Sequence, residues 1–154
     1  MKYWPRSGRN GVKRSMTKRR TYIDANVWIA AVQSDGALLQ RVWPVLQSDR
    51  KRLVISDFIL LEVLPKPLFH RRTRQKRILE QLFSLTEKLT PDHETLLPQA
   101  IRLAGDYDLS PMDALHAATA LQGQVDEFIT LERPTKPLFR IPELHAHSLY
   151  SECE

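Results

Sequence analysis

The stretch TYIDANVWI at residues 21–29 constrains the fold of this chain more than any other. A short run of β-favouring residues leads into Asp24, and an apolar segment of helical character follows it. This order predicts the first strand of an α/β sheet, with Asp24 at its carboxyl end. Ligands of open α/β sheets bind just beyond the carboxyl ends of the strands. We therefore expect Asp24 to lie at the edge where such a fold would place its site.

Composition limits the class of protein. The chain has 154 residues, of which 42% are hydrophobic and 27% charged, which is typical of a single soluble domain with a real core. It has no run of about 18 apolar residues that would predict a membrane helix, and no apolar segment follows the basic N-terminus as in a secretory signal. Its single cysteine, Cys153, excludes an intrachain disulfide and a cysteine-based zinc site. We expect a cytoplasmic protein without a membrane partner.

The placement of charge divides the chain. The formal net charge is +5, yet residues 1–20 hold eight basic side chains and no acid, so the other 15 basic residues face 18 acidic ones and give that part a net charge of −3. We expect residues 1–18 to form an unfolded basic extension and residues 19–152 to form one domain. Such an arm can hold nucleic acid nonspecifically. A merely solvated extension, or a true start at Met16, are the alternatives.

Strand and helix patterns alternate along the chain. The expected strands lie at about 20–24, 53–55, 85–89, 127–130 and 147–150. The expected helices lie at about 26–32, 37–48, 58–64, 68–84, 92–107 and 112–122. Pro44 should kink or divide the second helix. This alternation predicts an α/β fold with a parallel sheet of four to five strands and helices on both faces.

The last helix has the clearest boundaries. Ser110 suits the N-cap and Pro111 the first helical position, while Gly123 follows its end. Small apolar residues surround the helix on nearly all sides, which predicts that it is buried.

Four acidic residues occupy informative positions: Asp24, Glu62, Asp113 and Glu132. Asp24 ends the first strand, and Glu132 follows the fourth strand by two residues. Glu62 lies in the otherwise apolar run 58–64, where an acid is costly unless it is paired, bound to a metal or turned to a cleft. Asp113 lies in the first turn of the last helix. These positions share one edge of a parallel sheet, so the carboxylates are expected to gather there.

Several carboxylates in one cleft repel one another unless a cation compensates them. Mg²⁺ or Mn²⁺ suits such a set of oxygen ligands, and a metal held in this way promotes hydrolysis of phosphodiesters. Each acid also has a structural alternative. Asp24 would then be an ordinary polar residue at a strand end, Glu62 would pair with an arginine, Asp113 would complete a capping box with Ser110, and Glu132 would be a loop residue.

The order of these motifs resembles a PIN-domain protein of the VapC toxin type. The resemblance covers about residues 21–150 and rests on the segments YIDAN at 22–26, ISD at 55–57, LEV at 61–63, SPMDALHAATA at 110–120 and FIT at 128–130. It implies a three-layer α/β/α fold with a central parallel sheet. It also implies an endoribonuclease that uses Mg²⁺ or Mn²⁺, forms homodimers and, as a toxin, is blocked by a cognate antitoxin.

The resemblance also implies roles for single residues. Asp24, Glu62 and Asp113 would be the acidic metal-site residues, with Asn26 and Thr130 as supporting polar groups. The family usually has an aspartate shortly after the fourth strand, and this sequence has Glu132 there instead. That departure makes the fourth ligand an open question.

Three further features complete the candidate site. Asp126 is an alternative acid, but it precedes the fourth strand and should lie at the wrong edge of the sheet. His116 shares a helix face with Asp113; it would either contact substrate or, more often for such a histidine, satisfy a hydrogen bond in the core. A basic cluster could hold an RNA backbone, or could be a solvated face or a surface for an acidic partner: Lys66, Arg71, Arg72, Arg74, Lys76 and Arg77.

The sequence supports a metal-dependent endoribonuclease first. The main alternative is a PIN-like module that binds RNA or protein without cutting, which the Glu132 departure motivates. A phosphatase resembling the haloacid-dehalogenase class, with Asp24 as nucleophile, is disfavoured because Asn26 replaces the second aspartate of that class's D-x-D pattern and the chain is short for that fold.

Overall fold

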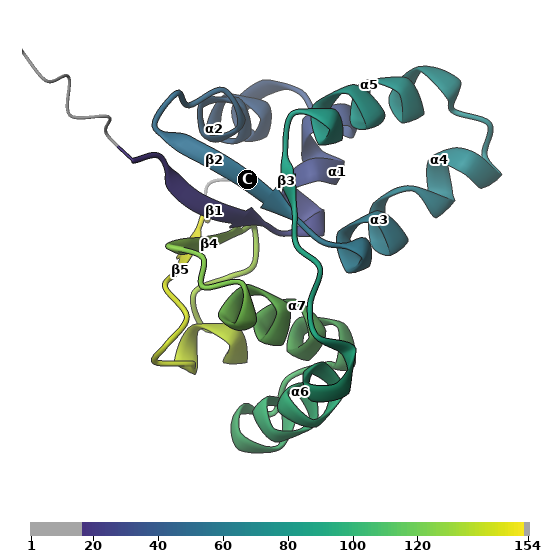
Figure 1. The fold of residues 1–154 in the computed structure, drawn as a ribbon. Coiled ribbons are helices and arrows are strands. Elements are labelled where there is room, and N and C mark those ends of the chain that lie inside the picture. Colours follow the sequence, from purple (N-terminus) through teal and green to yellow (C-terminus); the bar gives the residue numbers. More distant parts are fainter. Residues whose placement is uncertain (1–16, 153–154) are drawn as a thin grey trace, which may run out of the picture.

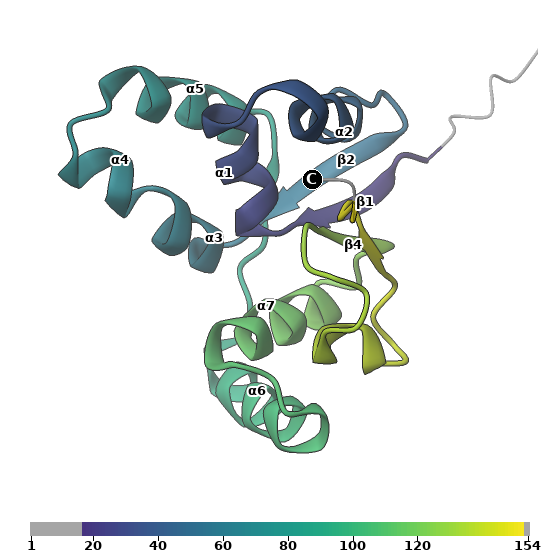
Figure 2. The same ribbon diagram turned by 180° about the vertical axis from the view of Figure 1, so that it is seen from behind.

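The structure, a computed structural model, describes residues 17–152 as one parallel sheet with helices on both of its faces (Figures 1 and 2). The expected basic arm falls almost wholly outside the described residues; Thr17 and Lys18 are exposed and precede the first strand. Within residues 17–152, no helix has the length and apolar character needed to span a membrane.

The sheet has five strands: β1 (Arg19–Ile23), β2 (Lys51–Ile55), β3 (Glu87–Lys88), β4 (Glu127–Thr130) and β5 (Ala146–Ser148). Their order is β3-β2-β1-β4-β5, and every pairing is parallel. Tyr22 of β1 lies opposite Val54 of β2 on one side and Phe128 of β4 on the other. The chain adds β2 and β3 on one side of β1 and then β4 and β5 on the other, so the strand order reverses between β1 and β4. Ligands of such sheets bind at that reversal.

The helices form two layers. One layer carries α1 (Ala25–Gln33), α2 (Gly36–Leu46) and α5 (Thr73–Ser84), and the other carries α6 (His93–Tyr107), α7 (Pro111–Gln122) and the 3₁₀ turn η1 (Pro137–Arg140). The short helices α3 (Asp57–Val63) and α4 (Pro65–Phe69) extend from the carboxyl end of β2 (Figure 1). This arrangement confirms the expected α/β/α fold, because helices cover both faces of the parallel sheet.

Aromatic side chains from both halves of the sheet meet in the core. Tyr22, Trp28 and Phe128 are fully buried, and the Tyr22 ring stacks on Phe128 with their centroids 5.2 Å apart. The Trp28 indole donates a hydrogen bond to the carbonyl of Ile23 (3.1 Å). This bond ties α1 to the end of β1, so the residue between them, Asp24, has a fixed backbone.

Two local expectations need correction. Pro44 lies inside a single helix, α2, so of the two expected outcomes, a kink or a division, the division does not occur. Pro44 and Gln40, whose carbonyl loses its helical donor, are both exposed, so water can take that bond. The basic helix expected over 68–84 is two helices, because Arg71 adopts a left-handed backbone (φ 53°) after α4. The amides of Arg71 and Arg72 donate to the carbonyls of Leu68 and Pro67, the pattern that closes a helix C-terminus.

The start of α7 allows a first test. Ser110 Oγ accepts a hydrogen bond from the backbone amide of Asp113 (3.3 Å), as its N-cap position predicts. We expect Ser110→Ala to lower the free energy of unfolding by about 1 kcal/mol in urea titrations, because that amide loses its partner. Ser110→Thr keeps the oxygen and is the control. Equal losses in both variants would contradict a capping role.

Candidate functional site

Three strands end side by side at the carboxyl edge of the sheet. Asp24 follows β1, Ser56 follows β2, and Thr130 is the last residue of β4. The backbone amide of Asp24 donates to the carbonyl of Ile129 (2.9 Å), which fixes the ends of β1 and β4 against each other. The candidate site therefore lies at the reversal of the strand order.

Asp24 is held by both oxygens of its carboxylate. It is the N-cap of α1, with Oδ1 accepting from the Ala25 amide (2.8 Å) and Oδ2 accepting from the Thr130 hydroxyl (2.7 Å). The residue is only 7% exposed. A carboxylate this buried, and positioned by a strand end and a helix start, has one orientation.

Thr130 directs its hydroxyl proton at Asp24. Its Oγ1 accepts from Nδ2 of Asn26 (3.2 Å) and from the backbone amide of Glu132 (3.1 Å), so its single proton remains for the carboxylate. Asn26 Oδ1 in turn accepts from the Leu131 amide (3.1 Å). The two expected supporting residues thus lie in one hydrogen-bonded group with Asp24. Glu132 joins that group through its backbone, and its side chain is half-buried.

Burial raises the pKa of Asp24 above its ordinary value. The nearby Asp113 carboxylate raises this pKa further, while His116 and the hydrogen bonds from Thr130 and the Ala25 amide act in the opposite direction. A carboxylate whose ionised form is disfavoured in this way gains from any cation that binds to it.

Glu62 lies on α3 with its side chain 34% exposed, and its partner is a histidine. Oε1 of Glu62 is hydrogen-bonded to Nε2 of His116, which lies on α7 and is 1% exposed. An arginine partner, the structural alternative for Glu62, is therefore not what the structure shows. His116 does take the core position that the sequence favoured for it.

Sequence reasoning missed two residues beneath this pair. The Tyr22 hydroxyl lies 2.7 Å from His116 Nδ1 and 2.7 Å from Ser56 Oγ. Burial raises the pKa of Tyr22 well above its usual range, so the phenol is protonated. The only sequence feature that could have indicated Tyr22 is the alternation of side chains along β1, which turns Tyr22 and Asp24 to the same face of the sheet.

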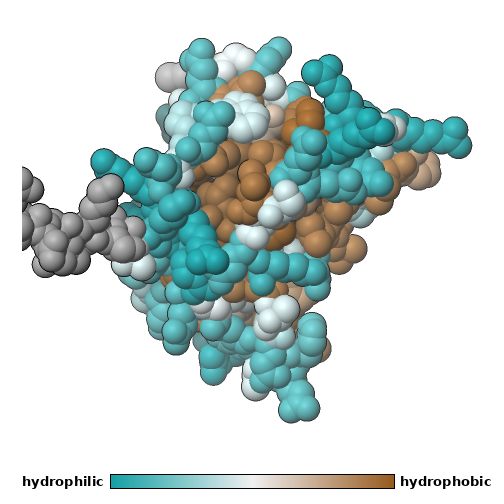
Figure 3. Space-filling model, turned by 45° about the horizontal axis from the view of Figure 1, so that its top comes forward, coloured by the Kyte–Doolittle hydropathy of each residue, from teal (hydrophilic) through white to brown (hydrophobic). Residues whose placement is uncertain are grey.

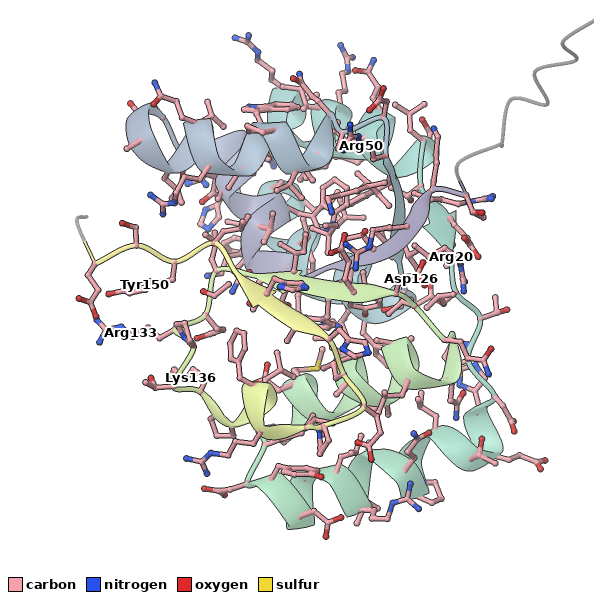
Figure 4. All side chains as sticks on the ribbon, turned by 90° about the vertical axis from the view of Figure 1, so that its left-hand side faces the viewer. Arg20, Arg50, Asp126, Arg133, Lys136 and Tyr150 are labelled. Carbon is pink, nitrogen blue, oxygen red and sulfur yellow. The ribbon has the colours of Figure 1, made fainter. Side chains whose placement is uncertain are left out.

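The remaining acids occupy different places. Asp113 is half-buried in the first turn of α7 and influences Asp24 electrostatically. Asp126 precedes β4 at the amino edge of the sheet, where it accepts a hydrogen bond from the Arg20 amide (2.7 Å). Figure 4 shows Asp126 beside Arg20 and far from Arg133 and Tyr150, which follow the carboxyl ends of β4 and β5. Asp126 therefore does not replace Glu132.

The donor set fits a hard divalent cation in its chemistry. Asp24, Glu62 and Asp113 supply carboxylate oxygens, and burial and mutual repulsion leave Asp24 short of compensating positive charge. Within residues 17–152, however, no three acidic, histidine or cysteine side chains approach closely enough to form a metal-binding group. Glu62 is instead engaged with His116.

The basic cluster lies around the end of α4 and the start of α5 (Figure 1). Arg71, Arg72, Arg74 and Arg77 are exposed, and Lys76 is 3.5 Å from Glu80. Four arginines on a single protruding segment leave a surface with a strong positive charge.

Solved structures share this fold at low sequence identity. A toxin–antitoxin complex from Klebsiella pneumoniae matches with a TM-score of 0.66 and 20% identity, covering 85% of this chain and 98% of the other. VapBC2 from Rickettsia felis, bound to a promoter DNA fragment, matches with a TM-score of 0.64 and 15% identity over 84% and 98%. VapBC-1 from nontypeable Haemophilus influenzae matches with a TM-score of 0.63 and 21% identity over 84% and 98%.

Sequence comparison gives the family. No curated protein matches the chain significantly. The PIN domain matches residues 21–133, which include Asp24, Glu62, Asp113 and Glu132. The chain therefore belongs to the PIN-domain family, a family of nucleases.

Proposed function

We propose that this protein is a metal-dependent endoribonuclease that hydrolyses RNA phosphodiester bonds. The observation that carries the proposal is Asp24: a buried carboxylate at the strand-order reversal, oriented by Thr130, whose pKa is raised by burial and by Asp113. The other buried acid among the described residues, Glu127, is paired with the Lys51 ammonium. The hydrogen-bond donors to Asp24 are neutral groups, the Ala25 amide and the Thr130 hydroxyl, so they leave its negative charge available to bind a metal ion.

Asp24, Glu62 and Asp113 would hold Mg²⁺ or Mn²⁺, with Glu132 as the fourth acidic residue. The bound ion would polarise the phosphodiester and lower the pKa of an attacking water. Thr130 and Asn26 keep the Asp24 carboxylate in place. The hydrogen bond from Thr130 also partly compensates the charge of Asp24 and favours its ionised form.

The test is incubation of purified protein with total RNA in Mn²⁺, Mg²⁺ or EDTA, followed by mapping of the new 5′ ends. Cleavage that requires the metal and recurs at defined positions would support the proposal and identify the substrate. Intact RNA in all three conditions, from protein that is folded, would overturn it.

A binding module that does not cut is the second candidate. The absence of an assembled metal-binding group within residues 17–152 favours it, as does Glu132 in place of the usual aspartate. Titration with Mn²⁺, followed by the electron paramagnetic resonance of free Mn²⁺, separates the two. Stoichiometric binding supports the enzyme, whereas RNA binding without Mn²⁺ binding supports the module.

We further propose that the basic cluster, Arg71, Arg72, Arg74, Lys76 and Arg77, holds the RNA backbone. Arg72→Glu/Arg74→Glu should weaken RNA binding at least about tenfold and flatten its salt dependence, because each phosphate contact releases counterions. Fluorescence anisotropy with labelled RNA at several salt concentrations measures both effects. Arg102→Glu/Arg140→Glu changes the charge equally on exposed residues of the other helical layer and is the control. Equal losses in both pairs would mean that only net charge matters.

Partners and cellular setting are also proposals. The likeness to toxin–antitoxin complexes supports a toxin with a cognate antitoxin. We propose that the protein acts as a homodimer in the cytoplasm. Residues 19–152 would form its single domain, and residues 1–18 a basic extension. Hydrophobic surface consistent with a protein partner is visible on the face that carries α2 and α5 and toward the α3–α4 end (Figure 3). Leu61, Leu68, Phe69 and Leu85 are more than half exposed there. Light scattering on the purified chain would show whether it is a dimer.

A further inference from the structure

We infer that His116 is a positioning residue, oriented by Tyr22 and Ser56, that holds the Glu62 carboxylate at the acidic edge and so sets the affinity of that edge for a divalent cation. The inference rests on the proposed function. It assigns a purpose to three buried side chains that the proposed chemistry does not use directly, Ser56, Tyr22 and His116. They form a hydrogen-bonded row that ends on Glu62.

The row joins four separate elements. Tyr22 belongs to β1, Ser56 follows β2, Glu62 lies on α3 and His116 lies on α7. Ser56, Tyr22 and His116 are at most 1% exposed, whereas the Glu62 side chain at the end of the row is 34% exposed. The row therefore runs from the core to the surface and ends on the acid proposed as a metal ligand.

Hydrogen-bonding capacity fixes the direction of the row when the imidazole is neutral. An ionised carboxylate only accepts, so Nε2 of His116 must carry the proton that it gives to Glu62. Nδ1 is then an acceptor, and the Tyr22 hydroxyl must donate to it. The one proton of that hydroxyl is thereby used, so the Ser56 hydroxyl donates to Tyr22. Each group thus selects the tautomer or the rotor of the next.

Ser56 gives up a more usual role to do this. It occupies the N-cap of α3, where a serine normally accepts a hydrogen bond from the helix, yet its side chain makes no capping bond. Its hydroxyl points to Tyr22 instead. A residue that departs from its local preference in favour of a buried contact marks a functional arrangement.

Ring packing prevents the imidazole from turning. The His116 ring packs in edge-to-face geometry against the Tyr22 ring, at a centroid distance of 5.8 Å, and against the Phe58 ring, at 6.5 Å. His116 engages Oε1 of Glu62, so the carboxylate has a second oxygen for a ligand. Hydrogen bonds of this type, from residues behind the ligands, orient metal-binding carboxylates in other proteins, and their loss lowers metal affinity about 10- to 100-fold.

The experiment measures the Kd of Mn²⁺ by electron paramagnetic resonance for folded variants, with circular dichroism as the check on folding. We expect His116→Leu to raise the Kd about 10- to 100-fold, and Tyr22→Phe to raise it less. His116→Gln should recover part of the loss, since its amide can donate to Glu62 and accept from Tyr22. In a Glu62→Gln background, His116→Leu should have no further effect. Thr119→Val, one turn further along α7, should leave the Kd unchanged.

The outcomes separate this inference from the proposed function. If wild type binds Mn²⁺ and folded His116→Leu binds it equally well, the positioning role is wrong and the proposed function stands. If His116→Leu does not fold, Tyr22→Phe takes its place, and an unchanged Kd in that variant has the same meaning. Additive losses in the Glu62→Gln background would also overturn it, because His116 would then act independently of Glu62. If wild type binds no Mn²⁺, the proposed function has failed and the inference fails with it.

Discussion

Asp24→Asn is expected to abolish metal-dependent RNA cleavage and, at the same time, to stabilise the protein at neutral pH. The loss of activity should exceed about 100-fold, because a neutral amide replaces the proposed metal ligand at the centre of the site. The gain in stability follows from the environment of Asp24, which is buried and disfavours a negative charge. The asparagine oxygen can still accept from the Ala25 amide, and its amide nitrogen then faces the Thr130 hydroxyl, to which it can donate, so the fold is kept.

The pH dependence gives this prediction its sign. The pKa of Asp24 is raised in the folded state, so its favourable contribution is complete below the unfolded-state pKa and is lost as pH rises through the folded-state pKa. The stability advantage of Asp24→Asn should therefore be absent in acid and should open as pH rises toward neutrality. Urea unfolding midpoints of both proteins between about pH 3 and pH 8 measure it.

Asp35→Asn is the matched control for this change. Asp35 is the exposed N-cap of α2 and makes no capping bond through its side chain, so its replacement should alter neither cleavage nor the pH profile of unfolding. Full activity in Asp24→Asn would show that Asp24 is not needed for cleavage. A stability difference that closes toward neutral pH would show that burial does not dominate its ionisation.

Glu127→Ala is expected to lower the free energy of unfolding by about 3 kcal/mol, with cleavage per folded molecule unchanged. Glu127 is 4% exposed at the amino edge of the sheet, opposite the candidate site. It is bonded to the Lys51 ammonium and accepts from the Thr21 hydroxyl (2.7 Å), and Arg19 lies 3.9 Å away. Removing the carboxylate takes away the ion-pair partner of Lys51 and the acceptor of the hydrogen bond from the buried Thr21 hydroxyl.

The pH dependence of this change has the opposite sign. Burial alone would raise the pKa of Glu127, but the hydrogen bonds from Lys51 and Thr21, together with the nearby positive charges, outweigh it, and the pKa lies below its ordinary value. Its contribution is therefore present above the unfolded-state pKa and lost as pH falls through the folded-state pKa. The difference between wild type and Glu127→Ala should shrink as the pH drops below about 4.5.

Urea titrations at pH 7 and pH 3 test this directly. The exposed Glu143→Ala is the control and should change the unfolding midpoint little at either pH. A loss for Glu127→Ala that is the same at both pH values would mean that packing, rather than the ion pair, stabilises this edge.

The two buried carboxylates, Glu127 and Asp24, show how a structural acid differs from a proposed site acid in this sheet. Both are inaccessible acids next to the central strand, one at each end. Glu127 has a lysine partner and a lowered pKa, whereas Asp24 has neutral hydrogen-bond donors and a raised pKa. An environment like that of Asp24 lowers stability, because neutral hydrogen-bond donors leave the charge of the carboxylate largely uncompensated. Such environments are typical of functional sites, where a bound ligand can supply the positive charge.

Local sequence patterns predicted most of the elements correctly. The β-favouring run before Asp24, the apolar run before Ser56 and the Ser110-Pro111 start of α7 each appear where expected. Patterns of this kind succeed because strand alternation, buried strands and caps depend on residues close in sequence. The final strand was displaced, with β5 at Ala146–Ser148 rather than 147–150. The break between α4 and α5 at Arg71 was not predicted, because nothing in an arginine side chain favours a left-handed backbone.

The sequence by itself determined the order of strands and helices, the position of Asp24 at a strand end and that of Asp113 in the first turn of α7, because strand ends and helix starts follow from local periodicity. Only the tertiary structure decided which groups touch. The parallel crossovers bring Tyr22, Ser56 and Glu62 against His116, and Lys51 against Glu127, from segments far apart in the chain. The physical reason is that a hydrogen bond or ion pair depends on distances of about 3 Å, which sequence spacing does not encode across separate elements.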